Sequence, residues 1–365
     1  MSENYVMLKD VCDKASSNIA QKDLLSHEGP YPIYGASGFI KNVDFFQREE
    51  EYIAVVKDGA GIGRTFKLPA QSSVIGTMQY ILPKGNIDIS YLYYAICAMH
   101  LEKYFSGATI PHIYFRDYQK EKLRLPSLDV QKRTAFVLDT IESIIAKRKQ
   151  QLSKLDELVK SRFIEMFGRE KYEPKILGEI ACITGGLTKN SMRKYFPLKY
   201  KYLRVANVLF NQFDLNEVLE IGVQQDEIER TLLKIGDLLF VEGNGSIEQI
   251  GRVAVWNDQI ANCLHQNHLI KARFNLSIVN PIYAMYYFML EEGRSQIVKK
   301  SVSTSGLHTL SVKKIGSLML PVPQLALQNK FVDFVKSTDK SKTAIQKSLD
   351  ELETLKKSLM QQYFG

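Results

Sequence analysis

The sequence predicts a molecule built twice from one plan, in which two globular domains are each followed by a long helix and the two helices pair antiparallel. Three observations predict this organisation: a close repeat at the end of the chain, a looser repeat upstream of it, and two coiled-coil seams. The close repeat aligns Leu349–Gly365 with Leu152–Gly168, and both segments end in Phe-Gly. A duplicated chain usually carries two similar surfaces for two similar targets.

The looser repeat predicts the same order of elements in both copies. Each copy should have a buried strand followed by a glycine-containing loop, and then an aromatic-rich helix that starts after a polar capping residue. Copy two is the longer one, mostly before Leu238, so we expect a common scaffold that carries different loops. The expected strands are 53–56 and 238–241, and the expected helices are 91–99 after Ser90 and 282–290 after Asn280-Pro281.

The two long helices each carry a narrow apolar seam, with residues recurring at alternating spacings of three and four. Such seams most simply pair with each other, and the globular copy between them favours an antiparallel pair. In the alternative interpretation, each helix packs on its own globular domain. Gly168 and Gly365 are placed as C-terminal helix stops. The seams comprise Leu138, Ile141, Ile145, Arg148, Leu152, Leu155, Val159, Arg162 and Met166 in the first helix, and Val335, Thr338, Lys342, Ile345, Leu349, Leu352, Lys356, Leu359 and Tyr363 in the second.

Composition limits the class of protein. With 365 residues, 45% hydrophobic and 24% charged, the chain has enough apolar residues for two medium cores and is not expected to be disordered. We expect neither a secretion signal nor a membrane span, because the apolar runs are short. The four cysteines are scattered without CxxC spacing, which favours a reducing cytoplasm. A net charge of +8 suits a polyanionic partner.

Six segments together carry a family resemblance. They are the run Tyr31–Ile40, the strand and glycine loop at 52–64, the LKIGDLL segment at 233–239, the Ile250-Gly251-Arg252 step and the two helix ends. In this order they resemble the DNA specificity subunit of type I restriction-modification enzymes, and the resemblance covers essentially the whole chain.

The resemblance implies an α+β fold with a pseudo-two-fold internal repeat. Two target-recognition domains, at 1–128 and 170–325, would be separated by an antiparallel coiled coil of spacer helices at 129–169 and 326–365. It also implies two docked adenine methyltransferase subunits and a motor-nuclease subunit for restriction. The specificity subunit of that family has no catalysis of its own, so S-adenosylmethionine, ATP and magnesium would belong to the partner subunits and no cofactor to this chain.

The residues agree that enzyme chemistry is not to be expected. The chain has no GxxxxGK[ST] phosphate loop. Asn280-Pro281-Ile282-Tyr283 resembles the NPPY element of adenine methyltransferases but has isoleucine in place of the second proline, so we interpret it as a helix cap. Gly59–Gly63 does not match the dinucleotide fingerprint and is interpreted as a tight loop whose amides are free to face a phosphate.

The segment Cys263–His268 allows three interpretations. Cys263, His265 and His268 are potential metal ligands, but in a strand His268 points to the opposite face from the other two, so a metal site is not expected. The segment is either an ordinary structural strand or an edge that offers His265, Gln266, Asn267 and His268 to DNA bases.

The segment Lys189–Arg204 is the strongest local indication of nucleic-acid binding, because cations alternate with aromatic residues along it. The alternative is a solvated loop whose tyrosines help to cover the domain. A charged run at 147–149 on the first long helix is interpreted as solvated or as facing the DNA backbone. The DNA-binding candidates are Lys41, Asn42, Lys57, Arg64, Lys67, Gln79, His112, Tyr114 and Arg116 in copy one, and Lys189, Arg193, Lys194, Lys199, Tyr200, Lys201, Arg204, Asn244, Arg252, His265, Gln266, Asn267, His268 and His308 in copy two.

Duplication with divergent loops predicts a bipartite, asymmetric DNA target whose gap is set by the coiled coil. Two other classes remain open from sequence. A freestanding DNA-binding regulator would bind a defined operator alone, and an enzyme with a non-standard site would transfer a methyl group without a partner.

Overall fold

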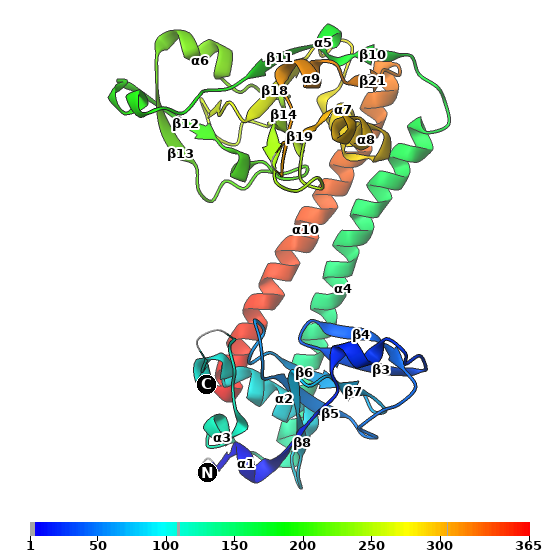
Figure 1. Ribbon diagram of the computed structural model, residues 1–365, viewed down its shortest axis with the longest axis vertical. Helices are drawn as coiled ribbons and strands as arrows, with labels where there is room; N and C mark the ends of the chain where they lie inside the picture. Colours follow the sequence, from blue (N-terminus) through cyan, green and yellow to red (C-terminus); the bar gives the residue numbers. More distant parts are fainter. Residues whose placement is uncertain (1–3, 108–109, 305) are drawn as a thin grey trace. The chain divides into compact units, whose positions relative to one another are not determined.

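The computed structural model describes residues 4–107, 110–304 and 306–365. Its contacts divide the chain into two units, and both long helices, α4 (Leu128–Phe167) and α10 (Leu325–Phe364), run through both of them (Figure 1). Unit 1 comprises residues 1–151 and 345–365, and unit 2 comprises residues 152–344. Among the described residues, no helix is both long enough and apolar enough to cross a lipid bilayer.

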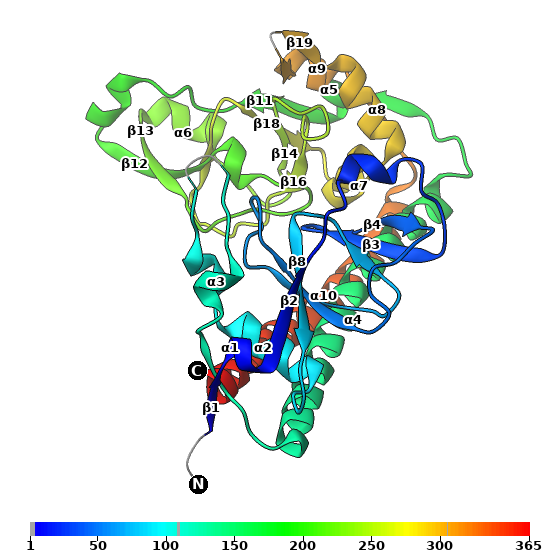
Figure 2. The ribbon, with the colours of Figure 1, turned by 60° about the horizontal axis from the view of Figure 1, so that its bottom comes forward.

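Unit 1 is built on a four-stranded antiparallel sheet in the order β2-β8-β5-β6, beside a three-stranded sheet β4-β3-β7 and a strand pair β1-β9. The central strand β5 is fully buried because α2 and the second sheet cover it, and the pairing of β2 with β8 can be followed in Figure 2. The elements are β1 Tyr5–Met7, α1 Leu8–Val11, β2 Cys12–Ser16, η1 Gln21–Leu24, β3 Tyr31–Gly35, β4 Gly38–Val43, β5 Tyr52–Val56, β6 Thr65–Leu68, β7 Ser73–Val74, β8 Met78–Pro83, α2 Ile89–Ala98, η2 Leu101–Tyr104, α3 Phe115–Tyr118 and β9 Lys122–Arg124.

Unit 2 repeats this plan with additions. Its four-stranded sheet has the order β11-β18-β14-β16, its second sheet is β13-β12-β17, and a strand pair β10-β21 corresponds to β1-β9. The elements are β10 Pro174–Ile176, α5 Leu177–Ile180, β11 Ala181–Gly185, η3 Ser191–Tyr195, β12 Leu198–Leu203, η4 Val205–Asn207, β13 Leu219–Val223, α6 Gln225–Thr231, β14 Leu238–Val241, β15 Gly243–Asn244, β16 Val253–Val255, β17 Leu264–His265, β18 Leu269–Phe274, α7 Pro281–Met289, α8 Glu291–Lys300, β19 Val302–Thr304, β20 Leu307–Thr309, α9 Val312–Gly316 and β21 Met319–Pro321.

The predicted internal repeat is confirmed by the strand pairing. In both units the second sheet joins one antiparallel and one parallel neighbour to its middle strand. The expected strands at 53–56 and 238–241 are β5 and β14, and both are buried. Unit 2 also contains α6, α8 and the small sheet β15-β20-β19. Its extra residues lie mostly between β11 and β14, as predicted.

The predicted caps of the aromatic helices are right in one copy and wrong in the other. Asn280 caps α7, since its side-chain oxygen accepts from the Ile282 N–H at 3.1 Å, so the helix-cap interpretation of this segment is confirmed. In unit 1 the cap is Asp88, which accepts from the Tyr91 N–H at 3.0 Å. Ser90 lies inside that helix because the first turn begins two residues earlier than expected.

A buried glutamine at the start of each long helix attaches the helix to a globular domain. Gln131 accepts from the Asp88 N–H at 2.8 Å and donates to the carbonyls of Asn86 and Pro126. Its side chain is 1% exposed. Without Gln131, each of these buried backbone groups would lose its hydrogen-bond partner and could not bond to water instead.

Gln328 makes the same contacts at the start of α10. It accepts from the Asn280 N–H at 2.8 Å and donates to the carbonyls of Ile278 and Pro323. The duplication therefore extends to individual hydrogen bonds.

The repeated Phe-Gly at the helix ends also has one role in both units. Phe364 packs on Tyr91 of α2 at a ring distance of 5.0 Å, and Phe167 packs on Tyr283 of α7 at 4.8 Å. The helices stop at these phenylalanines, and Gly168 follows as the expected stop but without a positive φ, its N–H bonded to the Ile164 carbonyl at 2.8 Å.

The antiparallel pairing of α4 and α10 is confirmed within each unit. In unit 1, Lys356 contacts Glu142 at 2.5 Å and Lys149 contacts Glu353 at 3.0 Å, so partners earlier in one helix meet partners later in the other. In unit 2, Lys342 of the second seam contacts Asp156 at 2.5 Å.

All the predicted seam residues are buried or half-buried. The seam lysines sit there because each carries its ammonium group to a carboxylate on the other helix, while its aliphatic stem covers apolar surface. The alternative interpretation holds at the helix ends, where Phe163 and Phe331 join the core of unit 2 and Ala135 joins that of unit 1.

Candidate nucleic-acid interface

A cavity of about 380 Å³ opens in unit 1 at the ends of β2, β5 and β8. It brings together four of the predicted DNA-binding residues, Lys57, Gln79, Tyr114 and Arg116. Residues from β2 and from the segment around α3 complete it. The full lining is Lys14, Ser16, Lys57, Gln79, Ile113, Tyr114, Phe115, Arg116 and Gln119.

The charge around the cavity is unbalanced. Three cationic residues line it, and its lining includes no carboxylate. Asp58, next to the lining, contacts Lys57 at 2.6 Å and His112 at 2.7 Å. Burial alone would raise the pKa of Asp58, but the hydrogen bonds from Lys57 and His112 hold it below its ordinary value. Lys57 is therefore partly neutralised, whereas Lys14 makes none of the ion pairs found in the described part of the chain.

Planar groups form a stacked column at one wall. The His112 ring stacks on Tyr114 with an interplanar angle of 22°, and the Arg116 guanidinium lies 4.7 Å from the Tyr114 ring centroid. Tyr114 is 45% exposed, so one part of its ring is available to a ligand.

Lys14, Ser16 and Gln119 were missed by sequence reasoning. The signal was present for the first two, because Lys14 and Ser16 alternate with Ala15 along a strand and therefore share a face. Their importance depends on the register, since Ser16 lies opposite Gln79 in the sheet. A single sequence does not show that pairing.

Gln79 does not fit the prediction that it reads a base. Its side chain is 2% exposed, and its amide N–H donates to the Tyr118 hydroxyl. The hydroxyl is a fixed internal partner, so Gln79 forms the floor of the cavity rather than a free reading group.

The other candidates of unit 1 lie outside the cavity. Lys67 contacts Asp139 of α4 at 3.2 Å and Ser90 at 2.6 Å, so it joins the domain to the long helix and is not free for DNA. Lys41 donates to the Leu24 carbonyl at 3.2 Å, while Asn42 and Arg64 are exposed.

The glycine loop at 59–63 is tight, as predicted, and Gly59 and Gly63 both have positive φ. Three of its amides are not free, however. The N–H groups of Gly59, Ile62 and Gly63 donate to the carbonyls of Pro111, Gly59 and Val56. For these three amides, the prediction that they face a phosphate is wrong.

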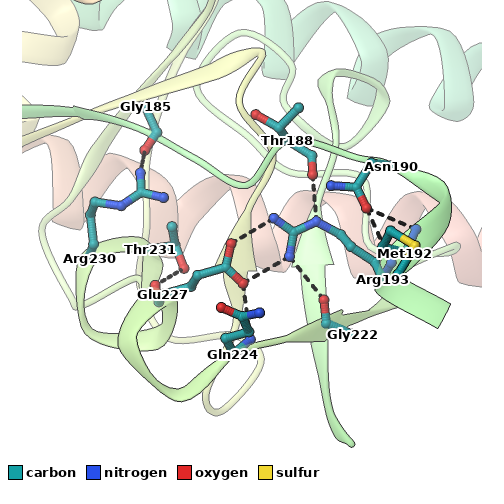
Figure 3. A network of polar contacts seen from close by, with 10 residues as sticks. All are labelled: Gly185, Thr188, Asn190, Met192, Arg193, Gly222, Gln224, Glu227, Arg230 and Thr231. Atoms are coloured by element: carbon teal, nitrogen blue, oxygen red, sulfur yellow. Dashed lines mark hydrogen bonds and ion pairs between the residues drawn. The ribbon is translucent and has the colours of Figure 1, made fainter. Parts of the chain in front are cut away.

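The basic segment of unit 2 is braced from within by Arg193 (Figure 3). Its guanidinium donates to both carboxylate oxygens of Glu227, at 2.8 and 3.0 Å, and to the carbonyls of Gly222 and Thr188. The side chain is only 8% exposed, so the prediction that Arg193 contacts DNA directly is wrong. Hydrogen bonds from Arg193 are the main cause that lowers the pKa of Glu227.

Two further features fix the same segment. Asn190 caps η3 by accepting from the N–H groups of Met192 and Arg193 at 3.0 and 3.2 Å. Gly222 is required because a Cβ there would lie 1.9 Å from the Arg193 carbonyl oxygen. The segment is thus held rigidly although it is exposed on its outer side.

The remaining cations of the segment divide into two groups. Lys189, Lys194 and Lys201 are exposed, and the Lys194 ammonium lies 4.7 Å from the ring centroid of the exposed Tyr195. Lys199 donates to the Arg193 and Lys194 carbonyls, Arg204 contacts Glu217 at 2.9 Å, and Tyr200 packs in the small core of the second sheet.

His265 is structural. It is fully buried, and its ring Nδ1–H donates to the Thr231 carbonyl at 2.8 Å. Burial, with the positive charge of Lys271 nearby, lowers the pKa of His265 to about 3, so the ring is neutral at pH 7. The structural-strand interpretation holds for this residue, and its predicted contact with DNA is wrong.

The neighbours of His265 remain nearer the surface. Gln266 and Asn267 are half-buried, and His268 is exposed and contacts Glu242 at 2.9 Å. Asn244 and His308 are cross-strand partners in the small sheet β15-β20-β19. Arg252 donates to the Val205 carbonyl at 3.2 Å. Within residues 4–107, 110–304 and 306–365, no group of three or more His, Cys, Asp or Glu side chains could hold a metal ion.

Comparisons with known proteins agree with the duplicated architecture. The family model for the type I restriction modification DNA specificity domain matches residues 3–156 and again 169–354. The MjaVIII specificity subunit of Methanocaldococcus jannaschii is 22% identical over 370 residues, which cover 91% of this chain and 85% of that protein. The EcoKI specificity subunit of Escherichia coli is 23% identical over 257 residues, 62% of this chain, which spans about half (52%) of that relative's length.

A solved structure shows the same fold. The S subunit of a type I restriction-modification system from M. genitalium superposes with a TM-score of 0.63 at 16% sequence identity, covering 100% of this chain and 97% of that one. Two family matches in tandem account for nearly all of the sequence. The chain therefore belongs to the family of type I restriction-modification DNA specificity subunits.

Proposed function

We propose that this chain reads a bipartite, asymmetric DNA target, with one half-site contacted by each unit. The observation that carries the proposal is the duplication of one fold with different polar surfaces on the two copies. The strand order and the glutamine contacts are the same in both units. The polar surfaces differ, since Lys14 and Lys57 of the cavity in unit 1 match Ile183 and Glu242 in unit 2. Shared scaffolds with different surfaces favour two different half-sites.

The paired helices would set the gap between the half-sites. Each helix has 40 residues, which at about 1.5 Å per residue is roughly 60 Å of helix. Seam residues and ion pairs hold the two helices together in both units, which supports a role as a spacer of defined length.

The chain would also scaffold two adenine methyltransferase subunits and, for restriction, a motor-nuclease subunit. Apolar side chains on α4 support such docking: Phe136 is 73% exposed, and Val137 and Ile144 lie partly exposed beside it. An apolar helix face in water favours burial by another protein. Catalysis, S-adenosylmethionine, ATP and magnesium would belong to those partners, and the complex would work on DNA in the cytoplasm.

The test is to map methylated adenines in cells with and without this chain. A bipartite motif should be methylated only when the chain is present. The isolated chain, incubated with DNA and S-adenosylmethionine, should transfer no methyl group. Methylation by the chain alone, or tight binding to one operator without any methyltransferase subunit, would contradict the proposal.

A second experiment tests the spacer. Removing one heptad from both helices, at matched positions such as 142–148 and 350–356, should shorten the gap and leave both half-sites unchanged. Removing a heptad from only one helix is the control, since it breaks the seam and should abolish methylation altogether. A double deletion that keeps the original gap would show that the helices do not set it.

A further inference from the structure

The cationic cavity of unit 1 has the chemistry of an anion site. Its lining supplies the ammonium groups of Lys14 and Lys57, the guanidinium of Arg116 and the hydroxyl of Ser16. The lining contains no carboxylate, and Asp58 beside it offsets only the charge of Lys57. The Arg116 guanidinium is 3.6 Å from Asp117, which is too long for a hydrogen bond, so its donors remain available. An anion with several acceptor oxygens satisfies this set of donors.

We propose that this cavity binds one phosphodiester group of the DNA backbone, with its adjoining sugar, on the half-site that unit 1 contacts. The inference rests on the proposed function and deepens it. The cavity would position the domain along the duplex without reading a base.

The shape of the cavity favours backbone over base. Base edges lie at the floor of a groove and are reached by protruding helices, strands or loops, whereas phosphates project outward and fit a concave surface. Gln79, the amide that could pair with adenine, is already bound to Tyr118 at the cavity floor.

The size of the cavity and its aromatic wall suit more than a bare ion. About 380 Å³ is many times the roughly 30 Å³ that one water molecule occupies in the liquid. Tyr114 is held in place by stacking on His112 and under Arg116, and its exposed part offers an apolar surface to a deoxyribose.

Unit 2 lacks this site at the matching positions of its sheet. Strand pairing aligns β2 with β11, β5 with β14 and β8 with β18. Lys14 and Lys57 are replaced by an isoleucine and a glutamate, which weakens the attraction for a phosphate, whereas Lys313 of α9 occupies the position of Arg116. The residues that match Lys14, Ser16, Lys57 and Gln79 are Ile183, Gly185, Glu242 and Ile270.

The experiment uses the complex of this chain with its methyltransferase subunits and a duplex carrying the mapped motif. The dissociation constant is measured against salt concentration for the wild type, Lys14→Gln and Arg116→Gln. Each variant should lower the slope of log affinity against log salt by about 1. The loss of affinity should be equal for the full target and for a duplex with half-site 1 scrambled, and the methylated motif should not change.

Lys347→Gln is the matched control, because Lys347 lies on α10 in the same unit with its side chain 81% exposed and should leave the slope unaltered. Lys14 is itself exposed, so its variant should keep the wild-type thermal unfolding temperature. A neutral methylphosphonate is then placed at each phosphate in turn. At one of the positions where it weakens the wild type, it should weaken Lys14→Gln and Arg116→Gln less.

Three outcomes would overturn the inference. An unchanged slope in both variants would remove the cavity from the interface. A changed base at half-site 1 would make it a base reader. Binding of inorganic phosphate to the free chain, without any methylphosphonate effect, would assign the cavity to a free anion. If no bipartite motif is methylated at all, the proposed function fails before these variants are compared.

Discussion

Replacing Arg193 with alanine should destabilise unit 2 and weaken one half-site only. The change removes four hydrogen bonds, two of them to Glu227, from a side chain that is 8% exposed. Breaking a buried ion pair costs about 3–5 kcal/mol. Glu227 is 20% exposed and keeps its bond from the Gln224 N–H, so the loss should lie near the lower end, about 3 kcal/mol.

The assay is urea unfolding followed by tryptophan fluorescence. Trp256 is the single tryptophan of the chain, is fully buried and belongs to unit 2, so its emission reports on that unit. Arg204→Ala is the control, since its partner Glu217 is 75% exposed and the expected loss is at most about 1 kcal/mol. Methylation should then weaken or relax at the half-site of unit 2 while the other half-site keeps its sequence.

The pH dependence of the same variant follows from Glu227. Its pKa is lowered in the folded state, mainly by Arg193, so the pair contributes its full stability above the ordinary value of 4.5 and loses it as the pH falls through the folded pKa. The difference between wild type and Arg193→Ala should therefore shrink below about pH 4. A loss of stability below 1 kcal/mol at pH 7, or an equal effect on both half-sites, would refute the bracing role.

Three further predictions concern the duplicated scaffold and the buried histidine. Gln131→Ala should speed hydrogen exchange of the α2 amides only, and Gln328→Ala should speed that of the α7 amides only. Each variant should lower the free energy of unfolding by about 2–3 kcal/mol, because buried groups lose their hydrogen-bond partners. Faster exchange in both helices with either variant would contradict separate attachment. Phe167→Ala should destabilise unit 2 by about 3–5 kcal/mol in urea unfolding, since four aromatic rings lose their contact with it, and a loss under 1 kcal/mol would argue against this packing. His265 has a folded pKa of about 3, so it binds a proton in the unfolded chain but not in the folded one as the pH falls below 6.5. Between pH 7.5 and 5.5 this difference should lower the free energy of unfolding of unit 2 by about 1.4 kcal/mol. His265→Gln should remove this pH dependence from the unfolding curves.

The architecture could be predicted from the sequence because local and periodic residue patterns determine it. The seams at Leu138 and Leu349 follow the helical repeat, and the paired Phe-Gly ends mark equivalent stops, so duplication and helix pairing could be inferred before any contact was known. The capping residue of α2 was misplaced by two positions because Asp88 and Ser90 are both acceptable caps and only the packed helix selects one.

The candidate site was accessible only in part. Lys57, Tyr114 and Arg116 were identified from their residue types and do meet in one cavity. Arg193 and His265 were wrong as DNA contacts, because a polar residue type suits a buried hydrogen-bond network as well as a surface.

The duplication, the two long helices and their antiparallel pairing could be predicted from residue spacing, because each follows from a pattern of residue types along the chain. Which polar side chains are free depends on contacts between segments that are distant in sequence. Lys14 faces the cavity and Gln79 is enclosed beneath it because strand register sets which neighbouring residues share a face. The sequence of one strand does not show which strand pairs with it.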